Sequence, residues 1–202
     1  MHISEGVLSA GALATGWAVT GLGTAMGLKR LETDRIVRVS LLSSAFFLAS
    51  LINIRIGPGS THLSLLAPIG LILGWTAFPA ILVALLLQAL LFHFGGLLVL
   101  GPNTAIMATP ALLVYLLFSR PIRRAEGIKA AALAFLAGAL SILLGALGVG
   151  LFLGLSDRNF LGVAKIVFAA HVPLAAVEGV ITAFFIAWLK RAAPEFLTGA
   201  EK

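Results

Sequence analysis

The chain has no cysteine among its 202 residues and little charge of either sign. The absence of cysteine excludes disulfide frameworks, thiolate metal sites and cysteine nucleophiles together. Only 11% of the residues are charged and 60% are hydrophobic, whereas about a quarter of the residues in a soluble domain are charged. This composition excludes an ordinary soluble domain. It predicts one all-α domain over residues 1–202 that crosses a membrane several times.

Two further absences limit the possible functions. The phosphate-binding pattern Gly-x-x-x-x-Gly-Lys-Ser/Thr does not occur, and there is no long polar segment that could form a soluble catalytic domain. We therefore expect a protein that is not an enzyme, has no cofactor and takes its energy from a partner. The net charge of +6 would suggest a nucleic-acid partner in a soluble protein. In a bilayer, basic loops facing an anionic leaflet explain this charge more simply, so we expect no nucleic acid.

Seven apolar stretches predict a bundle of about seven transmembrane helices. Their expected bounds are residues 7–28, 36–54, 63–76, 79–94, 103–118, 127–155 and 173–189. The first stretch is rich in glycine, so it should pack closely inside the bundle. The third is short for the ~20 residues that span a bilayer. Residues 156–172 are expected to form an irregular or interfacial approach to the last helix, which begins at Pro173.

Basic residues predict the orientation of the bundle in the membrane. With seven alternating spans, eleven of the 14 Lys and Arg residues fall on one side and three on the other. The larger group lies around residues 29–38, around residues 120–129 and at the C-terminal end. Because Lys and Arg are in excess in cytoplasmic loops, the N-terminus is predicted to lie outside and the C-terminus in the cytoplasm.

The first six residues, Met-His-Ile-Ser-Glu-Gly, are polar and lack the basic region of a secretory signal peptide. The terminal amine of Met1, the backbone nitrogen of His2 and the His2 ring can close a five- and a six-membered chelate ring on one metal ion. Nitrogens in one plane favour metals that accept square-planar or tetragonal ligation, such as Ni(II), Cu(II) or low-spin Co(II), over tetrahedral Zn(II). We predict that residues 1–6 form a metal-binding segment inserted into the bundle.

The other three histidines fall on the same predicted outer side as His2. His62 follows the second apolar stretch, His93 ends the fourth and His171 precedes the last. His62 also ends the polar connection 53–62, directly before a stretch too short to span the membrane unless His62 lies below its surface. An imidazole at that depth can complete the square plane begun by the first two residues. Polar residues inside a membrane are functional candidates by default.

Further polar residues are placed where they can orient the ligands and fix their tautomers. These candidates are Glu5, Ser60, Thr61, His93, Asn103, His171 and Glu178. Each also has a purely structural interpretation. Ser60 or Thr61 can cap the following helix, an interfacial imidazole can bond a backbone carbonyl, and a buried Glu178 carboxyl can bond a helix end. The sequence leaves both interpretations open.

Several short motifs occur in a distinctive order along nearly the whole chain. They are Met-His-Ile-Ser-Glu-Gly at 1–6, Ser-Thr-His at 60–62, His-Phe-Gly-Gly-Leu at 93–97, Leu-Gly-Pro-Asn-Thr at 100–104 and Ala-His-Val-Pro-Leu-Ala-Ala-Val-Glu-Gly at 170–179. Together they resemble the CbiM/NikM family. Its members are the substrate-specific (S) components of energy-coupling factor (ECF) ABC transporters for cobalt and nickel.

The resemblance implies a fold, a ligand set and partners. In that family a seven-helix bundle holds Co²⁺ or Ni²⁺ by nitrogens that correspond here to Met1, His2 and His62. The implied location is the cytoplasmic (inner) membrane. The implied partners are a CbiQ/NikQ-like transmembrane coupling (T) component, CbiO/NikO-like ATPases and, often, a small CbiN/NikN-like accessory membrane protein. The loop Gly-Pro-Gly-Ser-Thr-His-Leu differs from that of many cobalt members, so the choice between cobalt and nickel stays open.

Docking against the T component requires a close-packing surface that faces lipid. Ala45 and Ala49 form a small-xxx-small pattern on the second stretch and are candidates for it, although ordinary packing inside the bundle explains the pattern equally well. Three other functions stay open. The first is a stand-alone metal channel or exchanger, and the second is an S component for an organic vitamin, which would need an aromatic-lined cavity. The third is an intramembrane zinc metalloenzyme using His62, His93 and His171 with Glu178 as base, although no His-Glu-x-x-His motif is present.

Overall fold

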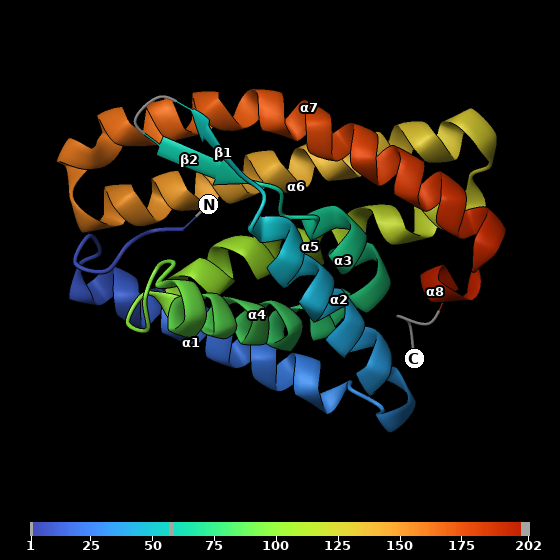
Figure 1. The fold of residues 1–202 in the computed structure, drawn as a ribbon, viewed down its shortest axis with the longest axis horizontal. Helices are drawn as coiled ribbons and strands as arrows, with labels where there is room; N and C mark the ends of the chain where they lie inside the picture. The colour runs from blue at the N-terminus through green and yellow to red at the C-terminus, as the bar shows by residue number, and fades with distance from the viewer. Residues whose placement is uncertain (1, 57–58, 199–202) are drawn as a thin grey trace.

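A computed structural model describes residues 2–56 and 59–198 of the chain. The described residues form seven main helices: α1 (Ala10–Lys29), α2 (Ile36–Ser50), α3 (Leu66–Leu73), α4 (Ala77–Phe92), α5 (Leu100–Arg124), α6 (Gly127–Ser156) and α7 (Leu161–Ala192). Shorter elements are the 3-10 helices η1 (Thr33–Arg35), η2 (Gly74–Thr76) and η3 (Arg158–Phe160), the C-terminal α8 (Glu195–Thr198), and the strands β1 (Asn53–Ile56) and β2 (Gly59–His62). The predicted helical bundle is therefore confirmed (Figure 1).

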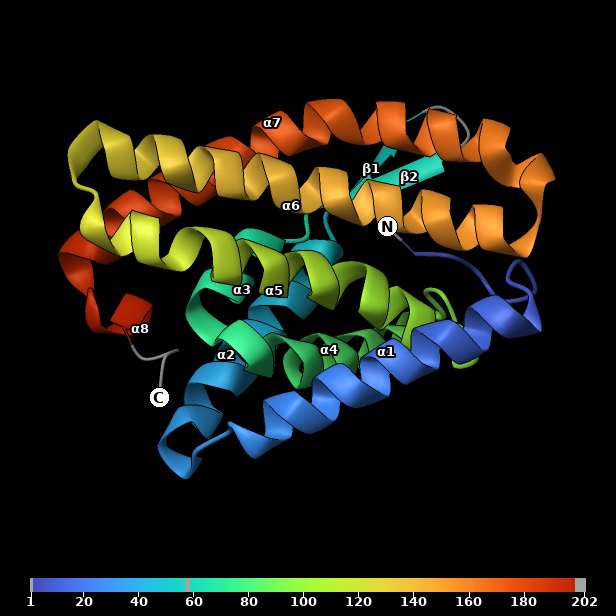
Figure 2. The ribbon, with the colours of Figure 1, turned by 180° about the vertical axis from the view of Figure 1, so that it is seen from behind.

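The helices pack in layers around α5. Helices α6 and α7 run side by side along one face, while α1, α2 and α4 lie on the other (Figures 1 and 2). Helix α5 lies between these layers and contacts α1, α3, α4 and α6. Every residue of the short helix α3 is buried. Helix α3 approaches α5 so closely that a Cβ atom at Gly70 would lie 2.0 Å from the carbonyl oxygen of Ala111.

Glycines on one face of α1 allow this helix to pack closely, as its composition predicts. A Cβ atom at Gly16 would lie 2.5 Å from Pro102 in α5, and one at Gly23 would lie 2.4 Å from the Phe78 ring in α4. Real Cβ atoms are not found at such distances, so only glycine permits this approach. These close contacts hold α1 against α4 and α5. The residues that precede α1 contact the same two helices, because His2 bonds Gln88 of α4 and Ile3 bonds Asn103 of α5.

Four described helical runs are long and apolar enough to cross a membrane. They are Leu66–Phe92, Leu100–Arg124, Gly127–Ser156 and Arg158–Ala192. Helices α3 and α4 together form the first run, although Gly74 breaks the helix between them with a φ of +56°. Helix α2 has only 15 residues. The multi-pass architecture is thus supported, while a total of seven spans stays a prediction.

The structure corrects the prediction for residues 156–172. Helix α7 is continuous from Leu161 to Ala192 with Pro173 in its interior, so its first part is helical rather than irregular. A proline removes one helical hydrogen bond, but neighbouring helices compensate for this loss in a membrane bundle. Here α7 packs against α6 along much of its length (Figures 1 and 2).

A β-hairpin replaces the loop expected between α2 and α3. Strands β1 and β2 pair in antiparallel fashion, with Asn53 opposite His62. Helix α2 accordingly ends at Ser50 rather than at residue 54. The hairpin contacts α7 through β2 and leads directly into the buried start of α3. His62 is therefore carried into the bundle by the last position of a strand.

The three basic clusters share one end of the bundle. The α1–α2 connection, the α5–α6 connection and the end of α7 lie at the right of Figure 1, whereas the start of α1 and the α6–α7 connection lie at the left. This arrangement is what a single cytoplasmic face requires, so it supports the predicted orientation.

Candidate metal-binding site

The N-terminal segment folds back from the start of α1 into the bundle. The backbone N–H of Ile3 donates to Oδ1 of Asn103 at 2.9 Å, and Nδ2 of Asn103 donates to the carbonyl of Ile3 at 3.0 Å. Both residues are buried. These two hydrogen bonds between the Ile3 backbone and the Asn103 side chain resemble those between paired β-strands, and they hold the N-terminal segment in place. Asn103 therefore contacts the backbone of the predicted metal-binding segment.

Glu5 contacts the connection between α4 and α5. Its carboxylate accepts a hydrogen bond from the backbone N–H of Leu98 at 2.9 Å, and its own N–H donates to the carbonyl of Gly95 at 3.2 Å. Glu5 is exposed. It fastens the segment to the connection between α4 and α5 rather than bonding an imidazole.

The two predicted imidazole ligands face each other. The ring centroids of His2 and His62 are 4.8 Å apart, with the ring planes tilted by 40°. His62 is 3% exposed and His2 is half-buried. The Phe94 ring lies 6.1 Å from the His2 ring and adds an apolar wall. Met1, the other predicted ligand residue, lies outside the described residues.

The hydrogen bonding of His62 leaves one ring nitrogen with a lone pair that could bind a ligand. Its Nδ1 lies 3.1 Å from the carbonyl oxygen of Leu63, and because a carbonyl only accepts, Nδ1 must carry the proton. The lone pair is therefore on Nε2. This Nε2 atom is buried and has no hydrogen-bond partner among the described residues. Burying a nitrogen lone pair without a hydrogen-bond partner costs free energy unless a ligand binds to that nitrogen.

Burial favours the neutral form of both rings. Desolvation lowers the pKa of His2 from 6.5 to about 3 and holds the pKa of His62 well below 6.5. Burial has this effect because it penalises the charged imidazolium. Both imidazoles can therefore serve as metal ligands at neutral pH without first losing a proton.

Glu178 stabilises the turn that follows His62 by accepting hydrogen bonds from its backbone. This buried α7 side chain accepts hydrogen bonds from the backbone N–H groups of Ser64 and Leu65, the latter at 3.1 and 3.2 Å to its two oxygens. These donors stand at the start of α3, where backbone N–H groups lack helical partners. Leu65 has a φ of +50°, which is unusual for a side chain of its size. The contacts favour the helix-end interpretation of Glu178 over one in which it bonds a metal ligand.

Replacing Glu178 with alanine should therefore loosen the His62 turn. Two buried N–H groups would lose their acceptor, which typically costs about 1–3 kcal/mol for each unsatisfied group. We expect a lower free energy of unfolding in an SDS titration and weaker Ni²⁺ binding by calorimetry. Val177→Ala, at the neighbouring exposed position, should change the unfolding free energy by less than about 0.5 kcal/mol. Equal stability and affinity in both variants would contradict this role.

Neither remaining histidine forms a group of three metal ligands with the pair among the described residues. His93 is exposed and ends α4 in a left-handed conformation with a φ of +57°. The Nδ1 of His171 lies 2.7 Å from the Val167 carbonyl, one turn earlier in the same helix, so it donates there. No group of three or more His, Asp or Glu side chains among the described residues could hold a metal ion. This geometry gives no support to a zinc site built from His62, His93 and His171.

Four other candidate residues are placed by the elements in which they lie. Ser60 and Thr61 lie in β2, whereas α3 begins at Leu66. Ala49 is buried inside the bundle and Ala45 is only partly exposed, which favours internal packing over a docking surface.

One residue of the site was missed by the sequence analysis. Gln88 of α4 is fully buried, and its Oε1 lies 2.9 Å from Nε2 of His2. It is the single polar residue in the apolar run from 77 to 92. A lone amide in an apolar membrane helix is a usable signal, because such groups are costly unless bonded.

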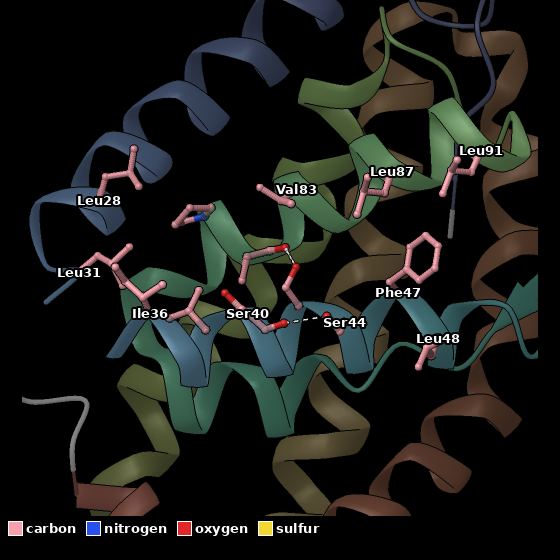
Figure 3. A pocket seen from close by; sticks show the side chains of 14 residues that line it. Leu28, Leu31, Ile36, Ser40, Ser44, Phe47, Leu48, Val83, Leu87 and Leu91 are labelled. Atoms are coloured by element: carbon pink, nitrogen blue, oxygen red, sulfur yellow. Dashed lines mark hydrogen bonds between the residues drawn. The ribbon is translucent and has the colours of Figure 1, made fainter. Parts of the chain in front are cut away.

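A groove of about 580 Å³ on another part of the bundle is not a competing ligand site. It opens between the end of α1, α2 and α4, and Phe47 alone is aromatic among its described lining residues (Figure 3). Its Ser43 and Ser44 hydroxyls donate to the carbonyls of Ala80 and Ser40. The groove therefore offers neither the aromatic lining expected for an organic vitamin nor an acidic or imidazole ligand.

The fold and the site define a multi-pass membrane protein with two facing imidazole rings in its interior, a donor type that suits transition metals. The family model CbiM, described as "Cobalt uptake substrate-specific transmembrane region", matches residues 2–196. The chain belongs to the CbiM family.

Relatives and solved structures agree with this assignment. A Haemophilus influenzae protein, provisionally named a metal transport protein, is 36% identical over 203 residues, which cover 100% of this chain and 98% of that protein. The fused nickel transport protein NikMN of Rhodobacter capsulatus is 31% identical over 224 residues, covering 98% of this chain and 64% of that protein. The crystal structure of a transition metal transporter superimposes with a TM-score of 0.75 at 26% identity, covering 95% of this chain and 93% of the other.

Proposed function

We propose that the chain is the substrate-capture (S) component of an ECF-type importer for Co²⁺ or Ni²⁺ in the cytoplasmic membrane. The ion is held by the amine of Met1, the backbone nitrogen and ring of His2, and the ring of His62. The observation that carries this proposal is the buried, unpartnered Nε2 of His62, which belongs to a ring facing His2 at 4.8 Å between centroids.

The donor set favours a planar nitrogen site. Two imidazoles are too few to hold a divalent transition metal tightly, and no further His or carboxylate joins them among the described residues. Backbone and terminal nitrogens next to His2 can supply the missing donors through five- and six-membered chelate rings. Such a set suits square-planar Ni(II) or low-spin Co(II) better than tetrahedral Zn(II).

Partners are required for uptake in this proposal. The chain has no phosphate-binding loop, so CbiQ/NikQ-like T and CbiO/NikO-like ATPase subunits would supply coupling and energy. The NikMN relative is fused to further sequence beyond the part that this chain matches, which supports a CbiN/NikN-like accessory partner here. The shared end of the three basic clusters supports an N-terminus outside and a C-terminus in the cytoplasm.

Reconstitution tests this function against a stand-alone channel. Purified chain in lipid vesicles should bind Ni²⁺ without accumulating it, because the chain has no energy source of its own. Vesicles that also contain the T component and ATPases should accumulate ⁶³Ni²⁺ only with internal ATP. Passive equilibration of Ni²⁺ by the chain alone would instead identify a channel or exchanger and overturn the proposal.

A further inference from the structure

A directed chain of hydrogen bonds connects a backbone carbonyl of α2 to the His2 ring. The Ser50 hydroxyl lies 2.7 Å from the Phe47 carbonyl oxygen. Nε2 of Gln88 bonds the same Ser50 hydroxyl, and Oε1 of Gln88 lies 2.9 Å from Nε2 of His2. Ser50 is 1% exposed and Gln88 is 0% exposed. Water therefore has little access to exchange these partners.

The direction of every bond follows from the carbonyl at its end. A carbonyl oxygen only accepts, so the Ser50 hydroxyl must give it its one proton. Ser50 can then only accept from Gln88, which places the NH₂ group of the amide toward Ser50. The amide oxygen consequently faces His2. Because this oxygen also only accepts, the His2 ring must carry its proton on Nε2.

This tautomer leaves the lone pair of His2 on Nδ1. Nδ1 is the ring nitrogen that can close a six-membered chelate ring with the backbone nitrogen of the same residue, whereas Nε2 lies on the far side of the ring. His62 has the opposite arrangement, since its Nδ1 donates to Leu63 and its Nε2 is unpartnered among the described residues. Each ring thus has its proton on the side away from the lone pair that a shared ion would need.

We propose that Gln88, oriented by Ser50 and the Phe47 carbonyl, is the positioning residue that selects the metal-binding tautomer of His2. This inference rests on the proposed function, because it assigns His2 as a ligand. In metal sites generally, the ring nitrogen of a histidine that does not bind the metal donates to a hydrogen-bond acceptor, and the Gln88 amide oxygen would be that acceptor here. It fixes the tautomer and ring orientation and increases the basicity of the ligating nitrogen.

Nitrogen-15 NMR of the metal-free protein in detergent micelles tests the tautomer directly. Long-range ring correlations identify which nitrogen carries the proton, and a His2→Ala variant assigns the signals. We expect His2 of the wild type to be entirely in the Nε2–H form. Gln88→Leu should give a mixture of tautomers and lower the Ni²⁺ affinity by roughly 10–100-fold. Ser50→Ala, a milder change that frees the amide to turn over, should also give a mixture.

Two further variants separate positioning from packing. Gln88→Glu keeps an oxygen acceptor facing His2, so it should restore the Nε2–H tautomer and most of the affinity. Ser43→Ala removes another bond between the same two helices, from the Ser43 hydroxyl to the Ala80 carbonyl at 2.7 Å. It should leave both the tautomer and the affinity unchanged.

Two results would overturn the inference. One is a wild-type His2 that is protonated on Nδ1 in the metal-free protein, a measurement that needs no variant to fold. The other is a Gln88→Leu protein with the wild-type tautomer and affinity. Failure of the wild type to bind Ni²⁺ at all would refute the proposed function instead, and the tautomer experiment distinguishes the two failures because it contains no metal.

Discussion

One residue added before Met1 should abolish high-affinity Ni²⁺ or Co²⁺ binding while leaving the fold almost unchanged. The extension converts the terminal amine into an amide and displaces it from the chelate. Four-ligand metal sites bind with on the order of 10–16 kcal/mol, so each ligand is worth on the order of 3 kcal/mol, or about a hundredfold in Kd. The loss should therefore be at least a hundredfold by calorimetry in detergent.

The described contacts of the segment explain why the fold should survive. The Ile3–Asn103 pair and the Glu5–Leu98 bond hold the segment without using the amine. A protein with the same residue added after Lys202 is the matched control and should bind normally. Retention of wild-type affinity by the N-terminal extension would show that the amine is not a ligand.

His62→Ala should weaken metal binding to a similar extent, about a hundredfold or more. This substitution removes the buried Nε2 that has no partner among the described residues, and the ring contacts that it breaks there are local, to the Leu63 carbonyl and the Ser64 hydroxyl. Calorimetry with Ni²⁺ gives the affinity, and circular dichroism in the same micelles checks the helical fold.

His93→Ala is the matched control for this substitution, because His93 is exposed at the end of α4. It should bind Ni²⁺ as the wild type does. If His93→Ala lost as much affinity as His62→Ala, the histidines would act as a group and the two-imidazole site would be incorrect.

The sequence was sufficient to predict the main features of the bundle and the pair of facing rings. The apolar stretches predict the positions of most helices because a bilayer requires long apolar segments. His2 and His62, separated by 60 positions, were predicted to meet because a short apolar stretch after His62 implied a buried start. The structure places their ring centroids 4.8 Å apart.

Other features depend on tertiary contacts that no local pattern carries. Pro173 suggested a helix boundary, but packing against α6 keeps α7 continuous. Glu178 could have oriented a metal ligand or accepted hydrogen bonds at a helix end, and only its contact with the start of α3 favours the second role. Gln88 gave a signal as a lone amide, yet its partner is the N-terminal segment, 86 positions away. Sequence spacing does not predict such a contact.

X-ray absorption spectroscopy of the Ni²⁺-loaded protein tests the central claim most directly. The account predicts a four-coordinate, square-planar ion with nitrogen neighbours only, and with the outer-shell scattering of two imidazole rings. Six-coordinate nickel with oxygen neighbours, or scattering from fewer than two imidazoles, would contradict it.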